Sequence, residues 1–203
     1  MNTSTPLYCA SAAVSFVFIF TSRAAIVNPA GYTFDQPTGA GSFVYSDPSL
    51  TKLTDGVYGT SDWWTNGGVD WDGWVNTPAV NIDFNFNGVK SLNKISVGTV
   101  QDNLGDVVMP NVTVYSSVNG GSTWSLVGTV LIPASGANDG QYRTVVFDNL
   151  NVSANAMRIA LGANGPWTFT DEITFEAVPE PSTYLAGLSA LGMLGLFGWR
   201  NRN

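Results

Sequence analysis

The stretch Val80-Asn81-Ile82-Asp83-Phe84-Asn85-Phe86 alternates apolar and polar side chains without a break. Such period-two alternation is typical of a β-strand that buries one face and exposes the other. Residues 92–98 follow as a second expected strand. The middle of the chain is therefore predicted to be β-structure.

Short strands with the same pattern recur downstream. Val112 and Val114 alternate with polar neighbours, and Asn119-Gly120 then marks a hairpin turn before a return strand at residues 124–132. Further strands are expected at residues 42–45, 142–147, 157–161 and 173–177. About eight short strands separated by Gly, Asn and Asp turns, with no convincing helix between the two ends, predict an all-β fold, a jelly-roll β-sandwich.

The composition excludes several kinds of function. The 203 residues include no His, one Cys, and 15 Asp and Glu against 8 Lys and Arg, which leaves a net charge of −7. Without His there is no Ser-His-Asp triad and no His-ligated zinc, and one Cys cannot form an intrachain disulfide. An acidic chain lacks the basic surface that phosphate contacts need, so no nucleic-acid partner is expected.

Residues 1–24 are typical of a signal peptide. An apolar run at residues 10–20 is too short to span a bilayer but suits the apolar core of a signal. Ser22 and Ala24 are small residues at the positions that favour cleavage after Ala24, although residues 1–9 carry no Lys or Arg. Cleavage there would remove Cys9 and leave a mature chain without Cys.

The C-terminus combines a short motif, an apolar segment and a basic end. Val178-Pro179-Glu180-Pro181 precedes residues 184–199, which contain no charged side chain, and Arg200-Asn201-Arg202-Asn203 closes the chain. Sixteen helical residues reach roughly 24 Å, against about 30 Å of hydrocarbon, so we expect a short transmembrane helix at 184–199. The two terminal arginines predict that this end is cytoplasmic and the preceding domain is outside.

This order of features resembles the PEP-CTERM sorting signal of Gram-negative bacteria over residues 178–203. The resemblance implies an exosortase as partner, with Pro179, Glu180 and Pro181 forming a recognition site for that enzyme. It also implies transient anchoring in the inner membrane through residues 184–199, followed by export to the cell envelope or the extracellular polysaccharide matrix.

The remaining residues, 25–177, are large enough for one domain. Leu53-Thr54-Asp55-Gly56, a Trp-rich stretch and the alternating strand at residues 80–84 occur in that order, followed by the stretch at residues 109–117. Met157-Arg158-Ile159 and Asp171-Glu172-Ile173 complete the series. This order resembles the discoidin or F5/8 type C domain, a galactose-binding-like jelly roll, and implies one such domain at residues 25–177.

Residues 62–74 gather four Trp and three Asp. Indole rings stack on pyranose faces and carboxylates accept hydrogen bonds from sugar hydroxyls, so this combination favours a glycan site. We expect a long loop in which at least one indole keeps a face open to solvent. An alternative is that several of these rings cap the sandwich core. The candidate ligand-binding residues are Trp63, Trp64, Asp70, Trp71, Asp72 and Trp74.

Two other side chains are expected to have structural roles. Trp124 follows the hairpin turn and begins a strand, which favours packing in the core. Arg158 lies between Met157 and Ile159, so an ion pair or hydrogen bond within the domain is favoured over ligand contact.

The discoidin resemblance also implies a Ca²⁺ site. In that family, an Asp-Gly after the opening strand and a Glu at the start of the last strand can hold a structural Ca²⁺. The corresponding residues here are Asp55 and Glu172, with Thr60 as a further oxygen ligand. Ca²⁺ takes six to eight oxygen ligands, some from the backbone, which a short loop can supply. The alternative is that Asp55-Gly56 is only a turn.

The sequence as a whole predicts an exported bacterial envelope or matrix protein whose β-sandwich binds a glycan, and not an enzyme. Asp62, Asp70 and Asp72 are the acids that a glycosidase would need, but sequence does not give their separation. The alternative function is a structural or adhesion protein of the matrix without a defined small ligand.

Overall fold

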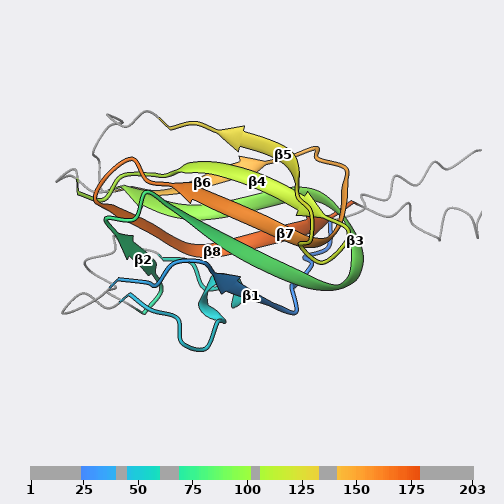
Figure 1. The fold of residues 1–203 in the computed structure, drawn as a ribbon, viewed down its shortest axis with the longest axis horizontal. Helices are drawn as coiled ribbons and strands as arrows, with labels where there is room; N and C mark the ends of the chain where they lie inside the picture. The colour runs from blue at the N-terminus through green and yellow to red at the C-terminus, as the bar shows by residue number, and fades with distance from the viewer. Residues whose placement is uncertain (1–23, 40–44, 60–68, 102–105, 133–140, 179–203) are drawn as a thin grey trace, which may run out of the picture. The chain divides into compact units, whose positions relative to one another are not determined.

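Eight strands and one 3-10 turn form the parts of the chain that the structure, a computed structural model, describes: residues 24–39, 45–59, 69–101, 106–132 and 141–178. These residues belong to one compact unit, Ala24–Pro179. In chain order the elements are β1 (Gly31–Phe34), η1 (Lys52–Thr54), β2 (Asp72–Val75), β3 (Ala79–Gln101), β4 (Asn111–Ser117), β5 (Ser125–Val130), β6 (Gln141–Phe147), β7 (Val152–Gly162) and β8 (Trp167–Ala177) (Figure 1). The all-β fold is confirmed.

The long strand β3 belongs to both layers of the sandwich. Its first half pairs with β1 and β7, and its second half pairs with β6 and β8. The register shifts between Asn85 and Lys90, where Gly88 has a φ of 81°. Glycine adopts this left-handed backbone at little cost, so the strand can change direction here. The two strands expected at residues 80–86 and 92–98 are thus halves of one element.

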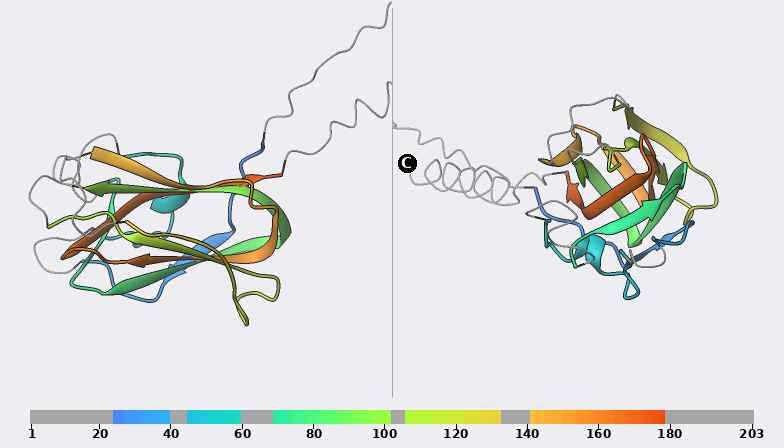
Figure 2. Two further views of the ribbon diagram at one scale, coloured as in Figure 1. Left: turned by 90° about the horizontal axis from the view of Figure 1, so that it is seen from above. Right: turned by 90° about the vertical axis from the view of Figure 1, so that its left-hand side faces the viewer.

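The pairing gives two antiparallel layers. One layer has the order β5-β4-β7-β3-β1 and the other has the order β6-β3-β8-β2. Figure 2 shows both layers, joined where β3 bends. Because the same strand runs through both, the sandwich can also be followed as one continuous sheet.

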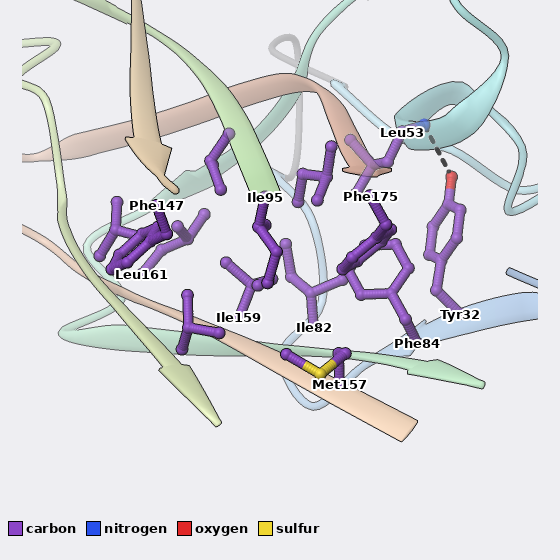
Figure 3. Close-up of a cluster of buried hydrophobic side chains, with 14 of the residues drawn as sticks. Tyr32, Leu53, Ile82, Phe84, Ile95, Phe147, Met157, Ile159, Leu161 and Phe175 are labelled. Carbon is purple, nitrogen blue, oxygen red and sulfur yellow. Dashed lines mark hydrogen bonds between the residues drawn. The ribbon is translucent and has the colours of Figure 1, made fainter. Parts of the chain in front are cut away.

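The core lies between the layers and follows the alternation in the sequence. Val80, Ile82 and Phe84 point inward with at most 1% of their surface exposed. Phe84 meets Phe175 of β8 with ring centroids 5.0 Å apart (Figure 3). Each buried side chain of this size contributes about 1.5–3 kcal/mol to the free energy of folding, so the inward-facing residues of β3 hold the two layers together.

A second, smaller apolar cluster packs on the outer face of the layer that contains β8. Val100 and Phe169 point away from the main core, opposite to Val97 and Ile173 on the same strands. The loops before β2 and β4 cover them. The buried members are Tyr45, Trp71, Val100, Val107 and Phe169.

Two strands differ from the sequence prediction. Both β1 and β2 have four residues and contain a glycine, and β2 begins with Asp72. Although Tyr, Thr, Phe, Trp and Val favour strands, four residues that include a glycine are too short to show a clear alternation. The strand expected at residues 42–45 is not supported at Tyr45, which is outside any strand, and residues 42–44 lie outside the described residues.

The sandwich has two different ends. At the bend end, where β3 turns at Gly88, β8 finishes and Ala177 N donates a hydrogen bond to Ala25 O at 2.8 Å. At the other end, the loop end, short loops connect β2 to β3 and β7 to β8. An eleven-residue strand such as β8 spans roughly 35 Å, so the domain's first and last described residues lie far from the loop end.

Among the described residues, no helix is long and apolar enough to cross a membrane. The expected signal peptide, the sorting motif Pro179, Glu180 and Pro181, and the transmembrane segment 184–199 lie outside the described residues, apart from Ala24, the last residue expected in the signal.

Candidate functional site

The structure places Trp71 and Trp74 in the interior. Trp71 is 0% exposed in the smaller cluster and Trp74 is 1% exposed in the main core. Trp74 packs edge-on against Phe34 at 5.2 Å and donates Nε1–H to Gln36 O at 3.3 Å. Neither ring keeps a face open to solvent, which corrects the assignment of these two residues as ligand-binding. The alternative, that they pack on the core, holds for both.

The physical reason is that residues 72–75 form β2 and are not part of a long loop. β2 pairs with the start of β8, with Asp72 opposite Thr170 and Val75 opposite Trp167. Gly73 leaves room for the Phe169 ring, since a Cβ there would lie 2.3 Å from a ring carbon. Trp63 and Trp64 lie outside the described residues, and Asp70 is half-exposed just before β2.

Asp72 is buried and forms an ion pair within the domain. Its carboxylate is 0% exposed, and Lys52 Nζ lies 3.1 Å from Asp72 Oδ1. Burial raises the pKa of Asp72 to about 7, although the Lys52 charge acts in the opposite direction. Lys52 Nζ also donates to the carbonyls of Ser46 and Trp71 at 2.9 and 3.2 Å. Asp72 thus fixes η1 against β2, which corrects its assignment as a ligand-binding residue.

Beside this pair, Tyr32 and Asp47 form a second buried polar contact. The Tyr32 hydroxyl donates to Asp47 Oδ2. It also accepts a hydrogen bond from Leu53 N at 2.9 Å (Figure 3). Burial, together with the hydrogen bond to Asp47, raises the pKa of Tyr32. Burial favours a higher pKa for Asp47 also, but the hydrogen bonds from Tyr32, Lys52 N and Ser49 outweigh it and the pKa is lowered. The network anchors the segment between β1 and β2.

A β-bulge brings Asp171 and Glu172 to the same outer face of β8. Val97 pairs with Ile173 and Thr99 with Thr170, so Gly98 alone stands opposite Asp171 and Glu172. A bulge places two successive side chains on one face, where ordinary alternation would separate them. Gly98 is required here, because a Cβ would lie 1.9 Å from Asp171 Oδ1.

The loop that contains Asp55 covers these two carboxylates. Gly59 N donates to Asp171 Oδ2 at 2.6 Å, and Gly56 N donates to Glu172 Oε2 at 3.1 Å. Burial raises the pKa of Asp171 to about 6 and that of Glu172 to about 7. The charges of Asp55 and Asp171 further raise the pKa of Glu172. The discoidin resemblance implies that Asp55 and Glu172 lie close together, but it does not indicate Asp171, since only the strand register reveals the bulge.

Few acidic side chains lie close enough together beside the bulge to form a metal centre. Within the described ranges, no three His, Cys, Asp or Glu side chains form a group that could hold a metal ion. Thr60, the third expected ligand, lies outside the described residues. The oxygens of Asp171 and Glu172 are of the type that Ca²⁺ prefers, but most of its ligands would have to be backbone carbonyls, Thr60 or water.

The loop end carries an open pocket that the sequence did not indicate. Its volume is about 460 Å³. It lies between the β2–β3 and β7–β8 loops, which are joined by hydrogen bonds from Asn76 N to Pro166 O at 2.7 Å and from Ala163 N to Pro78 O at 3.0 Å. We call it the loop-end pocket; it is lined by Asn76, Thr77, Pro78, Ala163, Asn164, Gly165 and Pro166.

Asn164 holds one wall of this pocket in place. Its Nδ2 donates to Met109 O at 2.8 Å and to Ile132 O at 3.1 Å, while its Oδ1 accepts from Asn111 Nδ2 at 3.1 Å. The amide therefore joins the segments next to β4, β5 and β7. Asn76, by contrast, is exposed, has a φ of 51°, and directs its backbone N–H to the facing loop.

Trp124 and Arg158 lie on the outer face of the other layer. Arg158 forms a bidentate ion pair with Asp83 of β3, with N–O distances of 2.6 and 2.7 Å. This is the structural role expected for Arg158. Its guanidinium carbon lies 4.6 Å from the centroid of the half-buried Trp124 ring. The prediction that Trp124 packs in the core is therefore wrong; it stacks on a cation at the surface.

The comparisons with known proteins bear on two parts of the chain. Residues 177–203 match the family described as the PEP-CTERM protein-sorting motif. The tail is a PEP-CTERM sorting motif. This confirms the resemblance seen in the sequence, and the motif implies export and membrane-associated sorting. A comparison with curated protein sequences found no match.

The β-sandwich is similar to solved carbohydrate-binding module structures. One contains the CBM32-1 and CBM32-2 domains of ZmpB from Clostridium perfringens, at 17% identity, with a TM-score of 0.50 over 74% of this chain and 35% of that one. Another shows the same domains in complex with GalNAc, at 17% identity and a TM-score of 0.52, over 74% and 33%. The chain thus spans about a third of the length of these structures. At this identity the likeness establishes the fold, and the discoidin-like prediction is confirmed at that level.

Proposed function

We propose that this chain is an exported protein that is sorted through its C-terminal motif and binds a glycan at the loop end of its β-sandwich. The observation that carries the proposal is the loop-end pocket, a shallow open depression on a fold that is similar to a carbohydrate-binding module structure solved with GalNAc. Amide and hydroxyl groups beside proline rings suit sugar hydroxyls and C–H faces. An exosortase and an extracellular polysaccharide are the proposed partners, in the cell envelope or matrix.

The place where the described part of the domain ends fits this role. The last described residues, Ala177 and Val178, lie at the bend end, where Val178 N donates to Ser91 O at 3.0 Å. The loop-end pocket lies at the opposite end of β8. A protein held through its C-terminus would therefore leave the pocket accessible.

We assign no catalysis to the acidic residues near β2. Asp72 is fully buried and paired with Lys52, so it is not placed to exchange a proton with a substrate. The solved relatives used above are named as carbohydrate-binding module domains. Binding without turnover is the function that the geometry supports.

A glycan array with the full chain in detergent tests the proposal. We expect retention on at least one glycan and about a tenfold loss of affinity in Asn76→Ala, which corresponds to about 1.4 kcal/mol, the size of one or two lost hydrogen bonds. Thr129→Ala, on the exposed outer face of β5, is the matched control and should bind normally. Failure of the wild-type chain to retain any glycan would favour the alternative of a structural matrix protein without a small ligand.

We also propose that Ca²⁺ binds beside the bulge through the expected ligands Asp55, Thr60 and Glu172, with backbone carbonyls and water completing its coordination. The support is the pair of buried carboxylates with raised pKa values, since a bound cation would stabilise their ionised forms. The ion would supply structural stabilisation of the loop that contains Asp55.

Addition of Ca²⁺ should raise the melting temperature by several degrees. Binding to the folded state alone contributes about 2.7 kcal/mol when free Ca²⁺ is 100 times its Kd. The shift should disappear in Glu172→Gln and persist in Glu176→Gln, a control on the same strand whose carboxylate pairs with Lys94. An unchanged melting temperature together with no Ca²⁺ in elemental analysis would rule out the site.

A further inference from the structure

The charge of the domain limits which glycan the loop-end pocket can take. Residues 25–178 carry five basic and 14 acidic side chains, a net charge of −9. The five basic residues all lie in parts of the chain that the structure describes. The structure therefore gives the position of each of these five side chains relative to the pocket.

Lys52, Lys94 and Arg158 each pair with a carboxylate of the domain. Lys52 pairs with Asp72 at 3.1 Å inside the fold. Lys94 pairs with Glu176 at 2.7 Å, on strands that meet toward the bend end. Arg158 holds Asp83 through two N–O contacts on the outer face of the first layer.

Neither of the other two cations lines the pocket. Lys90 pairs with Ala154 beside the bend of β3, at the opposite end of the sandwich. Arg143 is half-buried on β6, on the strand face that also carries the buried Val145 and Phe147. The register places Arg143 level with Thr170, toward the loop end. However, β6 is the far edge of its layer, separated from β2 by β3 and β8, and Arg143 is not part of the pocket lining.

The pocket itself has an uncharged lining. Its seven residues are Asn, Thr, Pro, Ala and Gly, and none can ionise. An acidic sugar would leave its carboxylate or sulfate without an ion-pair partner, in the field of a domain with net charge −9. A neutral sugar needs only hydroxyl hydrogen bonds and contact with the exposed rings of Pro78 and Pro166.

We propose that the loop-end pocket selects uncharged glycans and rejects uronate and other anionic ones. This rests on the proposed glycan-binding function and adds the chemical class of the ligand. Because the pocket forms no ion pair with the sugar, the affinity should change little between low and high salt. Recognition through ion pairs would weaken at high salt.

The test is affinity electrophoresis of the full chain in detergent through gels that contain a neutral galactan, a neutral glucan or polygalacturonate, with and without EDTA. We expect retardation by a neutral polymer, at both low and high salt, and none by polygalacturonate. Retardation of the wild-type chain by polygalacturonate, in either arm, would overturn the inference but leave glycan binding intact. No retardation by any polymer would overturn both.

A charge-gain variant makes the test independent of which neutral sugar fits best. Pro166 is exposed on the pocket lip, so Pro166→Lys adds a cation there, and Pro166→Gln is the uncharged control. We expect polygalacturonate to retard the Lys variant several-fold more than the Gln variant at low salt. Equal mobility of the two variants would show that charge at this pocket does not govern the choice of glycan, and would overturn the proposal.

Discussion

Replacing Lys52 with Met should lower the free energy of unfolding by about 3–5 kcal/mol at pH 8, because it leaves a buried carboxylate without its cation. Asp72 is 0% exposed and lies 3.1 Å from Lys52 Nζ, so little solvent can replace the lost charge. Urea-induced unfolding of the full chain in detergent, followed by Trp fluorescence, measures the effect.

The pH dependence of this loss identifies its cause. Burial raises the pKa of Asp72 in the folded state to about 7, from 3.8 in the unfolded chain. A carboxyl with a raised pKa stabilises the fold below its unfolded pKa, and that contribution disappears as the pH rises through the folded pKa. The Lys52→Met variant should therefore recover much of its stability at pH 5, where Asp72 is protonated.

Two controls separate charge from packing. The double variant Lys52→Met, Asp72→Asn should be more stable than Lys52→Met alone at pH 8, since the unpaired charge is gone. Lys94→Met removes an ion pair whose side chains are 37% and 22% exposed, and should cost no more than about 1 kcal/mol. A Lys52→Met loss that is small, or that stays the same at pH 5 and pH 8, would contradict the buried-pair interpretation.

Patterns among neighbouring residues were enough to predict two features, the inward face of β3 and the C-terminal motif. The alternation at residues 80–86 predicted the inward faces of β3, and Val80, Ile82 and Phe84 are buried as expected. The C-terminal motif is a string of adjacent residues and needs no fold to be found. The discoidin resemblance supplied the topology that alternation alone does not specify.

Features that depend on a distant strand were not visible in the sequence. Asp72 meets Thr170 across the β2–β8 ladder, so nothing near residue 72 shows that Trp71 and Trp74 are covered. The bulge at Asp171 and Glu172 depends on the register against Gly98. A run of Trp and Asp looks the same in sequence whether it lines a binding loop or fixes an edge strand to the core.

The loop-end pocket was missed for a different reason. Its lining contains no aromatic, acidic or basic residue, which are the types that signal chemistry in a sequence. Asn76-Thr77-Pro78 and Asn164-Gly165-Pro166 read as ordinary turns. Their meeting depends on backbone hydrogen bonds between loops about 90 residues apart, which the pairing of β2 with β8 and of β3 with β7 brings together.

Replacing Trp74 with Ala should destabilise the protein by about 3–5 kcal/mol, because the indole is 1% exposed and its loss leaves a cavity in the main core. The edge contact with Phe34 at 5.2 Å and the hydrogen bond to Gln36 O would be lost with it. For a domain of this size, that change lowers the melting temperature by roughly 10 °C or more. Differential scanning calorimetry of the full chain in detergent measures it.

The same series distinguishes the structural from the binding interpretation of the Trp-rich stretch. Trp124→Ala is the matched control: its ring is half-buried against Arg158, and a lost cation–π contact costs about 0.5–1 kcal/mol. Trp63→Ala and Trp64→Ala test the two indoles of this stretch that lie outside the described residues. If Trp74→Ala melted like the wild type but no longer bound glycan, the assignment of this indole to the core would be wrong, and the site predicted from sequence would include it. If Trp74→Ala instead lost much stability but still bound glycan below the melting temperature of the variant, Trp63, Trp64 and the loop-end pocket would remain the candidate sugar-binding residues.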